Sequence, residues 1–413
     1  MNKIRYIELF AGVGGFHVGL DRADGDFFQC VMANQWEPGS KDQFAANIYK
    51  ERFPNENLIN DDICKVSAKD IDTDMIVAGF CCQDYSVVCN KSKSLGIAGT
   101  KGVLWWEIIR MINEMNNKPN YLLFENVDRM LISPSKQRGR DFALILKSLI
   151  DLGYNVEWRV INAAEYGMPQ KRKRVFIFAF TDMISIDGPI NHLYKYGVLA
   201  KAFPVKQKIN ENGLWGVDGF ELNGDLVTIS DNFNKGNFQQ HPFENAGVVG
   251  DGLVYTEHVE PDYSGPYTTL RDILVTGDDR KYITDEYWLR DEDVKKWEYV
   301  KGHKVFNRVS KDGHEYLYTE GAMAFPDDLD KPARTIITSE ITSTPNRFTH
   351  IIKDPVTGKL RRLVPLELER IQMFPDNHTM GTTDKKRGFL MGNALVCGIV
   401  ERIGKGLKEV LCE

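Results

Sequence analysis

Apolar residues in the first 180 positions follow two alternating patterns. Short apolar runs of the kind found in buried strands alternate with stretches in which apolar residues recur every three or four positions, as on one face of a helix. The strand-like runs are residues 4–10, 30–36, 74–80, 121–127, 156–167 and 174–180. The helix-like stretches are residues 16–23, 105–115 and 141–153, together with the one-face spacing of Phe44, Ile48 and Tyr49. This alternation predicts an open α/β sheet with parallel strands.

The alternation stops near residue 184. Residues 184–330 are rich in Gly, Asn, Asp and Tyr and contain only short strand-like pieces. Residues 248–259 predict a hairpin that turns at Gly250, Asp251 and Gly252. We therefore expect a second, irregular and mainly β domain here.

Regular patterns return after residue 330. The runs 334–338 and 348–352 are strand-like, and a turn is expected from Asp354 to Gly358. Residues 365–374 predict a helix with Pro365 at its first position, and a last helix is expected from near Gly392 to the C-terminus. The predicted organisation is a first domain over 1–182, the irregular domain over 183–330, and a return to the first domain over 331–413.

The composition is that of an ordinary globular protein, with 42% hydrophobic and 27% charged residues among 413. No apolar stretch reaches membrane-spanning length and the N-terminus has no signal-peptide layout, so we expect a cytoplasmic protein without a membrane segment. The seven cysteines have no recurring CxxC spacing, which predicts reduced thiols and no metal site.

A net charge of −6 is unusual for a nucleic-acid binder, but phosphate contacts need only a local basic surface. Basic clusters occur at 171–174, 295–304 and 385–387. For any one cluster taken alone, a solvated face is the simpler interpretation.

A Gly-rich turn, Phe10-Ala-Gly-Val-Gly-Gly15, joins the first expected strand to the first expected helix. Glycines at this place let the backbone approach a ligand at a helix N-terminus. Two interpretations of this turn are equally supported. It would bind a nucleotide-type ligand, or it would be only a tight strand-to-helix connection. Its spacing is not the dinucleotide pattern GxGxxG, which counts against NAD.

Polar and aromatic positions lie at the end of the second expected strand, at Gln35 and Trp36, and before the third, at Asp62. Trp36, next to Gln35, would stack on an adenine and bond a ribose, although a Trp is more often part of a core. Asp62, before Ile63, would accept a hydrogen bond from an adenine amino group, or would be only a turn carboxylate.

Residues 79–86 read Gly-Phe-Cys-Cys-Gln-Asp-Tyr-Ser after a buried-type strand. The carboxyl end of a parallel strand is where open α/β sheets bind ligands, and the polar loop that follows, to Gly102, would close over a substrate. Glu125 ends the next strand after an apolar run, where a carboxylate must be paired or protonated. Arg172 and Arg174 open a later strand on one face, directed at an active site or at DNA phosphates.

These residues, in this order, resemble the cytosine-5 DNA methyltransferase family of the bacterial restriction–modification type. The matching segments are FAGVGGF at 10–16, NQW at 34–36, DI at 62–63, GFCCQDYS at 79–86, FENV at 124–127, QKRKR at 170–174, RRLVPLELERIQMFPD at 361–376 and GNALV at 392–396. Each segment is modest, but the ordered set is highly specific.

The resemblance implies a Rossmann-like S-adenosylmethionine-dependent catalytic domain over 1–182, a target-recognition domain over 183–330, and a C-terminal segment that completes the cofactor site. It implies that Cys82 is the nucleophile, and that Glu125, Arg172 and Arg174 hold a flipped cytosine. The residues implied for the cofactor pocket are Phe10, Gly12, Gly14, Gly15, Gln35, Trp36, Asp62, Ile63, Leu104, Asn393 and Ala394.

Two positions depart from the family pattern. Cys81 stands where the family usually has Pro before its catalytic cysteine, and Gln35 stands where an acidic residue bonds the ribose hydroxyls. The alignment with Gln83, Tyr85 and Ser86 favours Cys82 as the nucleophile. Because Gln still bonds a hydroxyl, we expect weaker cofactor binding rather than none.

The resemblance further implies double-stranded DNA as substrate, S-adenosylhomocysteine as product, a monomer, and a separate restriction endonuclease that cuts the same site. A tRNA cytosine-5 methyltransferase is an alternative, disfavoured by the long middle segment. An inactive DNA-binding regulator is another, disfavoured by the intact set Cys82, Glu125, Arg172 and Arg174. The glycine spacing and the late motifs disfavour an NAD-dependent oxidoreductase.

Overall fold

The computed structural model describes residues 3–80, 103–181, 184, 186, 188–207, 219–237, 241–250, 252–310 and 313–412. The contacts between Cα atoms divide the chain into two compact units. Unit 1 contains Met1–Tyr166, Arg172–Gly265 and Cys397–Glu413, and unit 2 contains Gly167–Lys171 and Pro266–Val396. Each unit is described by itself.

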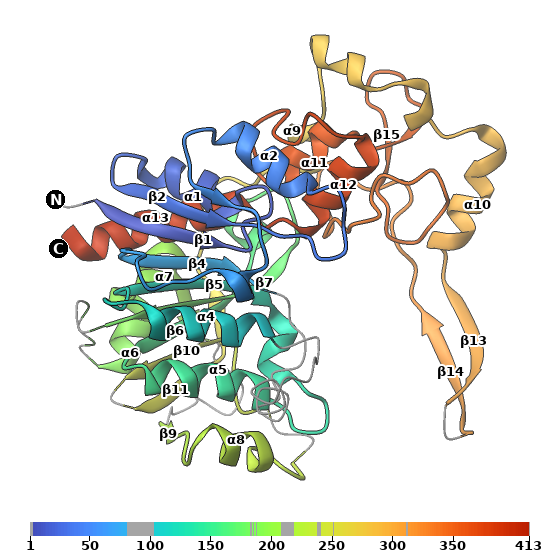
Figure 1. Cartoon of the computed structure of the whole chain (residues 1–413). Helices are drawn as coiled ribbons and strands as arrows, with labels where there is room; N and C mark the ends of the chain where they lie inside the picture. Colours follow the sequence, from blue (N-terminus) through green and yellow to red (C-terminus); the bar gives the residue numbers. More distant parts are fainter. Residues whose placement is uncertain are drawn as a thin grey trace. The chain divides into compact units, whose positions relative to one another are not determined.

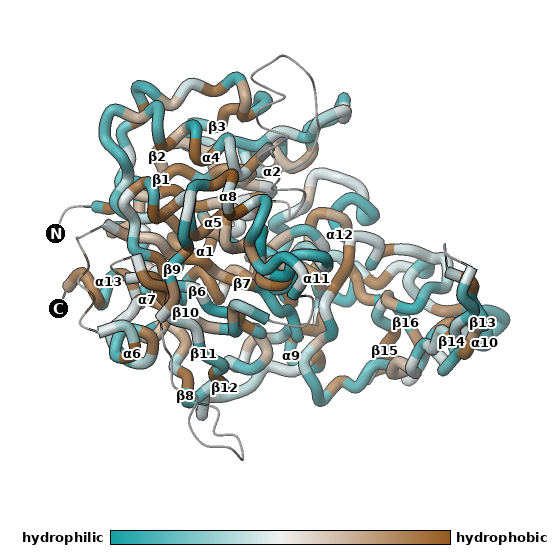
Figure 2. The backbone as a smooth tube through the Cα atoms, turned by 90° about the horizontal axis from the view of Figure 1, so that it is seen from below, coloured by the Kyte–Doolittle hydropathy of each residue, from teal (hydrophilic) through white to brown (hydrophobic). Residues whose placement is uncertain are grey.

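Unit 1 is built on a ten-stranded sheet with the order β3-β2-β1-β4-β5-β7-β6-β10-β11-β9 (Figure 1). The strands are β1 (Ile4–Leu9), β2 (Phe28–Asn34), β3 (Leu58–Ile59), β4 (Met75–Gly79), β5 (Tyr121–Val127), β6 (Asn155–Asn162), β7 (Lys173–Phe180), β9 (Phe220–Glu221), β10 (Ala246–Gly250) and β11 (Leu253–Glu257). Figure 2 colours much of this sheet brown, the hydrophobic end of its scale. Val77, Leu123 and Phe178 on its central strands are fully buried, as expected for a sheet covered on both faces.

The strands from β3 to β5 are parallel, as predicted. The expectation of parallel strands is wrong from β7 onward, because β7 pairs antiparallel with both β5 and β6. The connection from β6 to β7 explains this difference. It runs only from Ala163 to Arg172, too short for the helical crossover that parallel neighbours require.

Five longer helices lie in the described part of unit 1. They are α1 (Gly15–Asp24), α2 (Phe44–Arg52), α4 (Val103–Glu114), α5 (Arg140–Asp151) and α13 (Cys397–Cys412). Helices α1 and α13 pack closely because Gly19 has no side chain, and a Cβ atom there would lie 2.5 Å from the Cβ of Val400. On the α4 side, Trp105 and Phe124 join one large apolar cluster under the sheet.

The segment after β7 adds further elements to unit 1. These are α6 (Pro189–Asn191), η4 (His192–Tyr196), α7 (Val198–Ala202), β8 (Val205–Gln207), α8 (Leu226–Asn232) and β12 (Val259–Pro261), besides β9, β10 and β11. The predicted hairpin is confirmed, since β10 and β11 pair from Ala246 with Glu257 to Gly250 with Leu253. Because β10 also pairs with β6, residues up to Gly265 pack with the central sheet, and the units divide inside the segment expected to be a separate domain.

The described part of unit 2 contains short helices, two strand pairs and two isolated bridges rather than one large sheet. Its elements are α9 (Leu270–Ile273), η5 (Gly277–Tyr282), η6 (Asp285–Tyr287), α10 (Asp291–Lys301), β13 (Lys304–Val309), β14 (Glu315–Glu320), β15 (Ile351–Lys353), β16 (Leu360–Arg362), α11 (Pro365–Ile371) and α12 (Asp384–Asn393). Arg361 is fully buried and bonds both Glu367 and Asp354, so ion pairs replace part of an apolar core.

Four of the late sequence predictions can be compared with unit 2 and α13. The turn at 354–358 and the helix beginning at Pro365 are confirmed. The strand expected at 334–338 is wrong: its backbone bonds side chains instead of a ladder, as when the Ile336 N–H donates to Oε1 of Gln170 at 3.1 Å. The last helix begins at Cys397 rather than near Gly392, because Ala394 adopts an extended conformation that ends α12.

Among the described helices, none combines the length and the apolar character needed to cross a membrane.

Candidate active site

The turn after β1 carries the first group of predicted site residues. Phe10, Gly12 and Gly14 all have positive φ angles, of 55°, 57° and 86°. For a phenylalanine this conformation is strained, and such strain is typical of functional turns. Gly14 has no alternative residue, since a Cβ there would lie 2.4 Å from the ring of Phe53. Gly15 then begins α1, so the turn leads directly into a helix N-terminus, where N–H groups favour an anionic group.

Gln35 at the end of β2 holds this turn. Its Oε1 atom accepts a hydrogen bond of 2.7 Å from the N–H of Gly12. Asn60 donates to the carbonyl of Gln35 at 2.6 Å, which fixes the backbone between β2 and β3. The residue that departs from the family pattern is therefore already engaged with the Gly-rich turn. Trp36, next along the chain, keeps 37% of its surface exposed.

Glu8 lies beneath the same turn and was missed by the sequence analysis. Its carboxylate is fully buried and accepts hydrogen bonds from the N–H of Phe16 at 3.1 Å and from the hydroxyl of Tyr49 at 3.2 Å. Burial raises the pKa of Glu8 to about 8, against the lowering effect of these hydrogen bonds. The available signal was a carboxylate inside the apolar run 4–10, which requires a partner.

Asp62 and Ile63 lie in the turn after β3. Asp62 accepts a hydrogen bond of 3.0 Å from the N–H of Cys64 and caps the short helix η1 (Ile63–Lys65), while Ile63 is buried. Leu104, in the first turn of α4, is half-buried against the large apolar cluster. The capping role is the turn function that was the simpler interpretation of Asp62.

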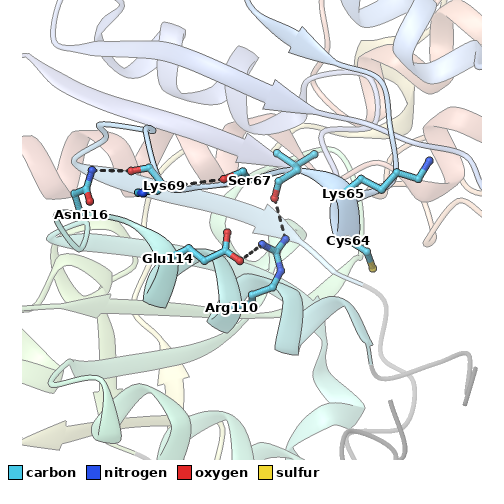
Figure 3. Close-up of a pocket in the computed structure, with 8 residues that line it drawn as sticks. Cys64, Lys65, Ser67, Lys69, Arg110, Glu114 and Asn116 are labelled. Carbon is cyan, nitrogen blue, oxygen red and sulfur yellow. Dashed lines mark hydrogen bonds and ion pairs between the residues drawn. The ribbon is translucent and has the colours of Figure 1, made fainter. Parts of the chain in front are cut away.

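A polar pocket of about 390 Å³ opens next to η1 (Figure 3). Its lining residues are Cys64, Lys65, Val66, Ser67, Lys69, Arg110, Glu114 and Asn116. Arg110 points into it but donates to the carbonyls of Ile63 and Val66 and pairs with Glu114 at 2.7 Å. Because its charge is compensated inside the protein, Arg110 joins η1 to α4 and does not present a cation to a ligand.

The carboxyl ends of β4 and β5 lie side by side, with Gly79 opposite Glu125. Beyond Gly79, Phe80 is buried and its carbonyl accepts a hydrogen bond of 2.9 Å from the side chain of Asn126. The chain is thus fixed up to the residue before Cys81. Cys81 and Cys82, and with them the predicted nucleophile, lie outside the described residues.

Glu125 is the centre of the charged part of this edge. The Nε atom of Arg174 lies 2.9 Å from Oε1 of Glu125, and both side chains are largely buried. Burial raises the pKa of Glu125, while Arg174 and Arg172 oppose that effect. The structure therefore brings Glu125, Arg172 and Arg174 together.

Arg172 is more deeply buried than its place in a basic cluster indicates. It is only 3% exposed, and burial, with repulsion from Arg174, lowers its pKa to about 9. Lys171 and Lys173 alternate with these arginines and are exposed. The solvated-face interpretation of this cluster is thus wrong for its two arginines and right for its two lysines.

Asn393 and Ala394 belong to unit 2, at the C-terminal end of α12. The side chain of Gln372 donates to the carbonyl of Ala394 at 2.9 Å and to that of Met391 at 2.7 Å, so this helix end is firmly held. Within the described part of the chain, no three metal-ligating side chains gather in one place.

The order and geometry of these residues agree with a comparison to known families. The model of the family described as C-5 cytosine-specific DNA methylase matches residues 4–409. The chain belongs to this family. The predicted family and the predicted DNA (cytosine-5-)-methyltransferase activity are confirmed at this level.

Curated members of the family resemble this methylase over almost its whole length. It is 45% identical to the Type II methyltransferase M.Sau3AI of Staphylococcus aureus over 99% of this chain and 97% of that protein. It is 27% identical to the Type II methyltransferase M1.ScrFI of Lactococcus lactis subsp. cremoris over 99% of this chain and 79% of that one.

Solved structures share the fold. The S. pombe Dnmt2 methyltransferase superposes with a TM-score of 0.59 at 16% identity and covers 99% of each chain. The Entamoeba histolytica methyltransferase EhMeth gives a TM-score of 0.57 at 16% identity, covering all of this chain and 98% of that one. The predicted Rossmann-like α/β fold class is therefore confirmed.

Proposed function

We propose that this methylase transfers a methyl group from S-adenosylmethionine to carbon 5 of a flipped cytosine within a specific duplex DNA sequence, and releases S-adenosylhomocysteine. The observation that carries the proposal is the pair of Glu125 and Arg174 at the carboxyl end of β5, opposite Gly79 of β4. A buried carboxylate bonded to a guanidinium presents both an acceptor and a donor to a pyrimidine ring.

The residues present fit S-adenosylmethionine. A Cβ added at Gly12 would meet no atom within 4 Å, so the turn after β1 leaves open space beside its backbone. When bound, the cofactor supplies an electrophilic methyl group. Phe10, Gly12, Gly14 and Gly15 would hold its amino-acid part, Gln35 and Trp36 its ribose and adenine, and Asp62 with Ile63 the edge of the adenine. Leu104, Asn393 and Ala394 would complete the pocket.

Cys82 would act as the nucleophile. Carbon 5 of cytosine is a poor nucleophile, and addition of the Cys82 thiolate to carbon 6 makes it enamine-like. Carbon 5 then takes the methyl group, the proton on carbon 5 is lost, and the bond between sulfur and carbon 6 breaks to restore the ring and the thiolate. A stacked base does not expose carbon 6, so the base must leave the duplex at a cost of a few kcal/mol.

Glu125, Arg172 and Arg174 would stabilise the adduct. Glu125 would hold a proton on N3, the ring nitrogen that does not carry the sugar, a role that the raised pKa of this carboxyl favours. Arg174 would donate to the ring carbonyl, where negative charge develops. The pKa of Arg172, about 9, leaves a positive charge near neutral pH that favours a thiolate in the same site.

We assign sequence recognition to the segment 183–330. Its partners would be double-stranded DNA and, by analogy with Type II systems, a separate endonuclease that acts on the same site. We further propose a monomer that works in the cytoplasm.

The purified chain, incubated with radiolabelled S-adenosylmethionine, tests the proposal. We expect label in duplex DNA at 5-methylcytosine and none in tRNA, and bisulfite sequencing of DNA from an expressing host should show one methylated sequence. Label in tRNA alone would support the tRNA methyltransferase instead. A folded protein that binds DNA but transfers no label to either substrate would support the inactive regulator.

A further inference from the structure

Strands β13 and β14 form a two-stranded ribbon in unit 2, drawn in orange in Figure 1 as an arm that extends beyond α10. Both of its faces are largely exposed. Val309 and Leu317 keep 64% and 66% of their surface in contact with solvent, and Tyr316 keeps 47%. An isolated ribbon is marginally stable in water, and exposed apolar residues in such number mark a binding surface.

The register of the pairing sorts the side chains onto two faces. Residues directly opposite each other in an antiparallel pair point to the same side. One face, called here the aromatic face, carries Lys304, Phe306, Arg308, Tyr316, Tyr318 and Glu320. The other face, called the aliphatic face, carries Val305, Asn307, Val309, Glu315, Leu317 and Thr319.

Arg308 is held on the aromatic face in a defined orientation. Its guanidinium carbon lies 3.8 Å from the centre of the Tyr318 ring. Stacking of this kind restrains the planar group and leaves the N–H groups at its edge available. No carboxylate among the described residues lies within ion-pair distance of Arg308. The one acid of this face, Glu320, pairs instead with Arg347 at 3.3 Å.

We propose that the ribbon enters the major groove of the DNA substrate with its aromatic face toward the base pairs, where Arg308 donates two hydrogen bonds to one guanine of the target sequence. This inference rests on the proposed function and names a specificity-determining residue for it. The major groove of B-DNA is about 12 Å wide and admits a two-stranded β-ribbon. The guanidinium edge matches the two acceptors of guanine, O6 and N7, in that groove.

DNA suits this surface better than a protein partner does. The aromatic face presents the cations Lys304 and Arg308, while Arg347 compensates its only acid. A groove lined by phosphates and guanine acceptors complements that charge. Tyr299, which lies under the Nζ atom of Lys304 at 4.5 Å, extends the cationic and aromatic surface toward α10.

The test uses the full chain and its own target, first identified by bisulfite sequencing. Methylation rates are then measured on duplexes in which each base pair of the target is changed singly. For Arg308→Ala we expect the methylation rate on the native target to fall roughly ten- to hundredfold. The preference for the correct base pair should be lost at one G·C pair and kept at the others. Arg308→Lys should recover little of this rate or of this preference, because lysine lacks the planar guanidinium that donates two parallel hydrogen bonds.

Two pairs of control variants separate recognition from folding. Tyr318→Phe keeps the stacking ring and should retain selectivity, whereas Tyr318→Leu should lose part of it at the same base pair. Leu317→Thr alters the opposite, aliphatic face, and Arg290→Ala removes an exposed arginine of unit 2 that lies off the ribbon. Both should leave selectivity and thermal stability unchanged.

Each other result overturns the inference. If Arg308→Lys restores full activity, Arg308 serves only a phosphate. If Arg308→Ala changes no preference, the ribbon serves a protein or no partner. If Arg308→Ala lowers activity equally on all duplexes together with the melting temperature, its role is structural. A wild-type chain that methylates no DNA would instead refute the proposed function itself. The wild-type reaction therefore tests the proposed function, and the Arg308 variants test only the inference.

Discussion

Arg174 and Arg308 are two arginines that the fold holds in opposite ways. Arg174 lies at the end of the central sheet, paired at 2.9 Å with a buried carboxylate. Arg308 lies on an exposed ribbon, stacked on a tyrosine and bonded to no acid among the described residues. A charge that stabilises a reacting ring must be fixed before the substrate arrives. A charge that reads a sequence must stay exposed to water until a base replaces that water.

The energies of the two arrangements differ accordingly. Removing one partner of a buried ion pair costs about 3–5 kcal/mol, because the remaining charge is left uncompensated. An exposed cation–π contact contributes about 0.5–1 kcal/mol. Substitutions at the sheet edge therefore put folding at risk together with chemistry, whereas substitutions on the ribbon should change recognition with little effect on stability.

The largest effect should come from the nucleophile. We expect Cys82→Ser to lower methyl transfer more than about a thousandfold, because a hydroxyl is a far weaker nucleophile than a thiolate. Cys81→Ser should keep most of the activity and serves as the neighbouring control. The measurement is transfer of label to duplex DNA. A dead Cys81→Ser protein beside an active Cys82→Ser protein would reverse the assignment.

Exchange of the middle segment tests whether sequence recognition is separate from the chemistry of methyl transfer. Grafting residues 183–330 from a relative of different specificity should move methylation to the donor's sequence, with a preference of about a thousandfold over the original site. A second chimera that exchanges only 266–330, within unit 2, should show the same change if the ribbon's unit reads the DNA. Bisulfite sequencing reads out both. A folded, active chimera of 183–330 that keeps the original target would contradict the assignment.

At the sheet edge, Glu125→Gln should slow transfer about a hundredfold while DNA affinity stays within a few-fold. The amide keeps the shape and still accepts from Arg174, but it holds no ionisable proton. Glu157→Gln is the matched control, since the side chain of Glu157 on β6 is 3% exposed, against 14% for Glu125, and bonds the N–H of Leu199 rather than the candidate site. Its variant should lose stability without slowing the chemistry of the folded fraction. Normal turnover by Glu125→Gln would remove Glu125 from the mechanism.

The smallest expected effect on methyl transfer concerns Glu8, whose titration should change stability instead. The pKa of Glu8 is raised to about 8 in the folded chain from 4.5, so the neutral carboxyl is favoured there. The stability that it contributes is present below pH 4.5 and is lost as the pH rises through about 8. Glu8→Gln keeps a neutral group, so its stability relative to the wild type should rise by roughly 4 kcal/mol between pH 5 and pH 9, measured from the melting temperatures.

Glu114 provides the opposite case on α4. Arg110 lowers the pKa of this exposed carboxyl, so the stability that it contributes is present at neutral pH and is lost as the pH falls. The stability that Glu114→Gln loses relative to the wild type should therefore become smaller at acid pH.

For Glu8, a stability difference between Glu8→Gln and the wild type that does not change with pH would contradict the prediction. It would mean that Glu8 is ionised in the folded protein at all these pH values.

Local spacing in the sequence determined much of this protein. The alternation of apolar runs predicted β1, β2, β4 and β5 and their helices, because periods of two and 3.6 residues reflect only neighbouring positions. The glycines after β1 and the strand-end Glu125 marked the candidate site for the same reason: each position is defined by the element just before it. The ordered motifs were enough to predict the family and its chemistry.

The tertiary structure alone decided which elements meet. The antiparallel placement of β7 depends on chain reversal and pairing partners, which residue periodicity does not encode. The burial of Glu8 under α1, and of Arg172 between exposed lysines, depends on what packs against them from distant segments. The register of β13 with β14 likewise placed Arg308 over Tyr318, ten positions away. Pairing and burial are long-range properties, so they became visible only once the chain had folded.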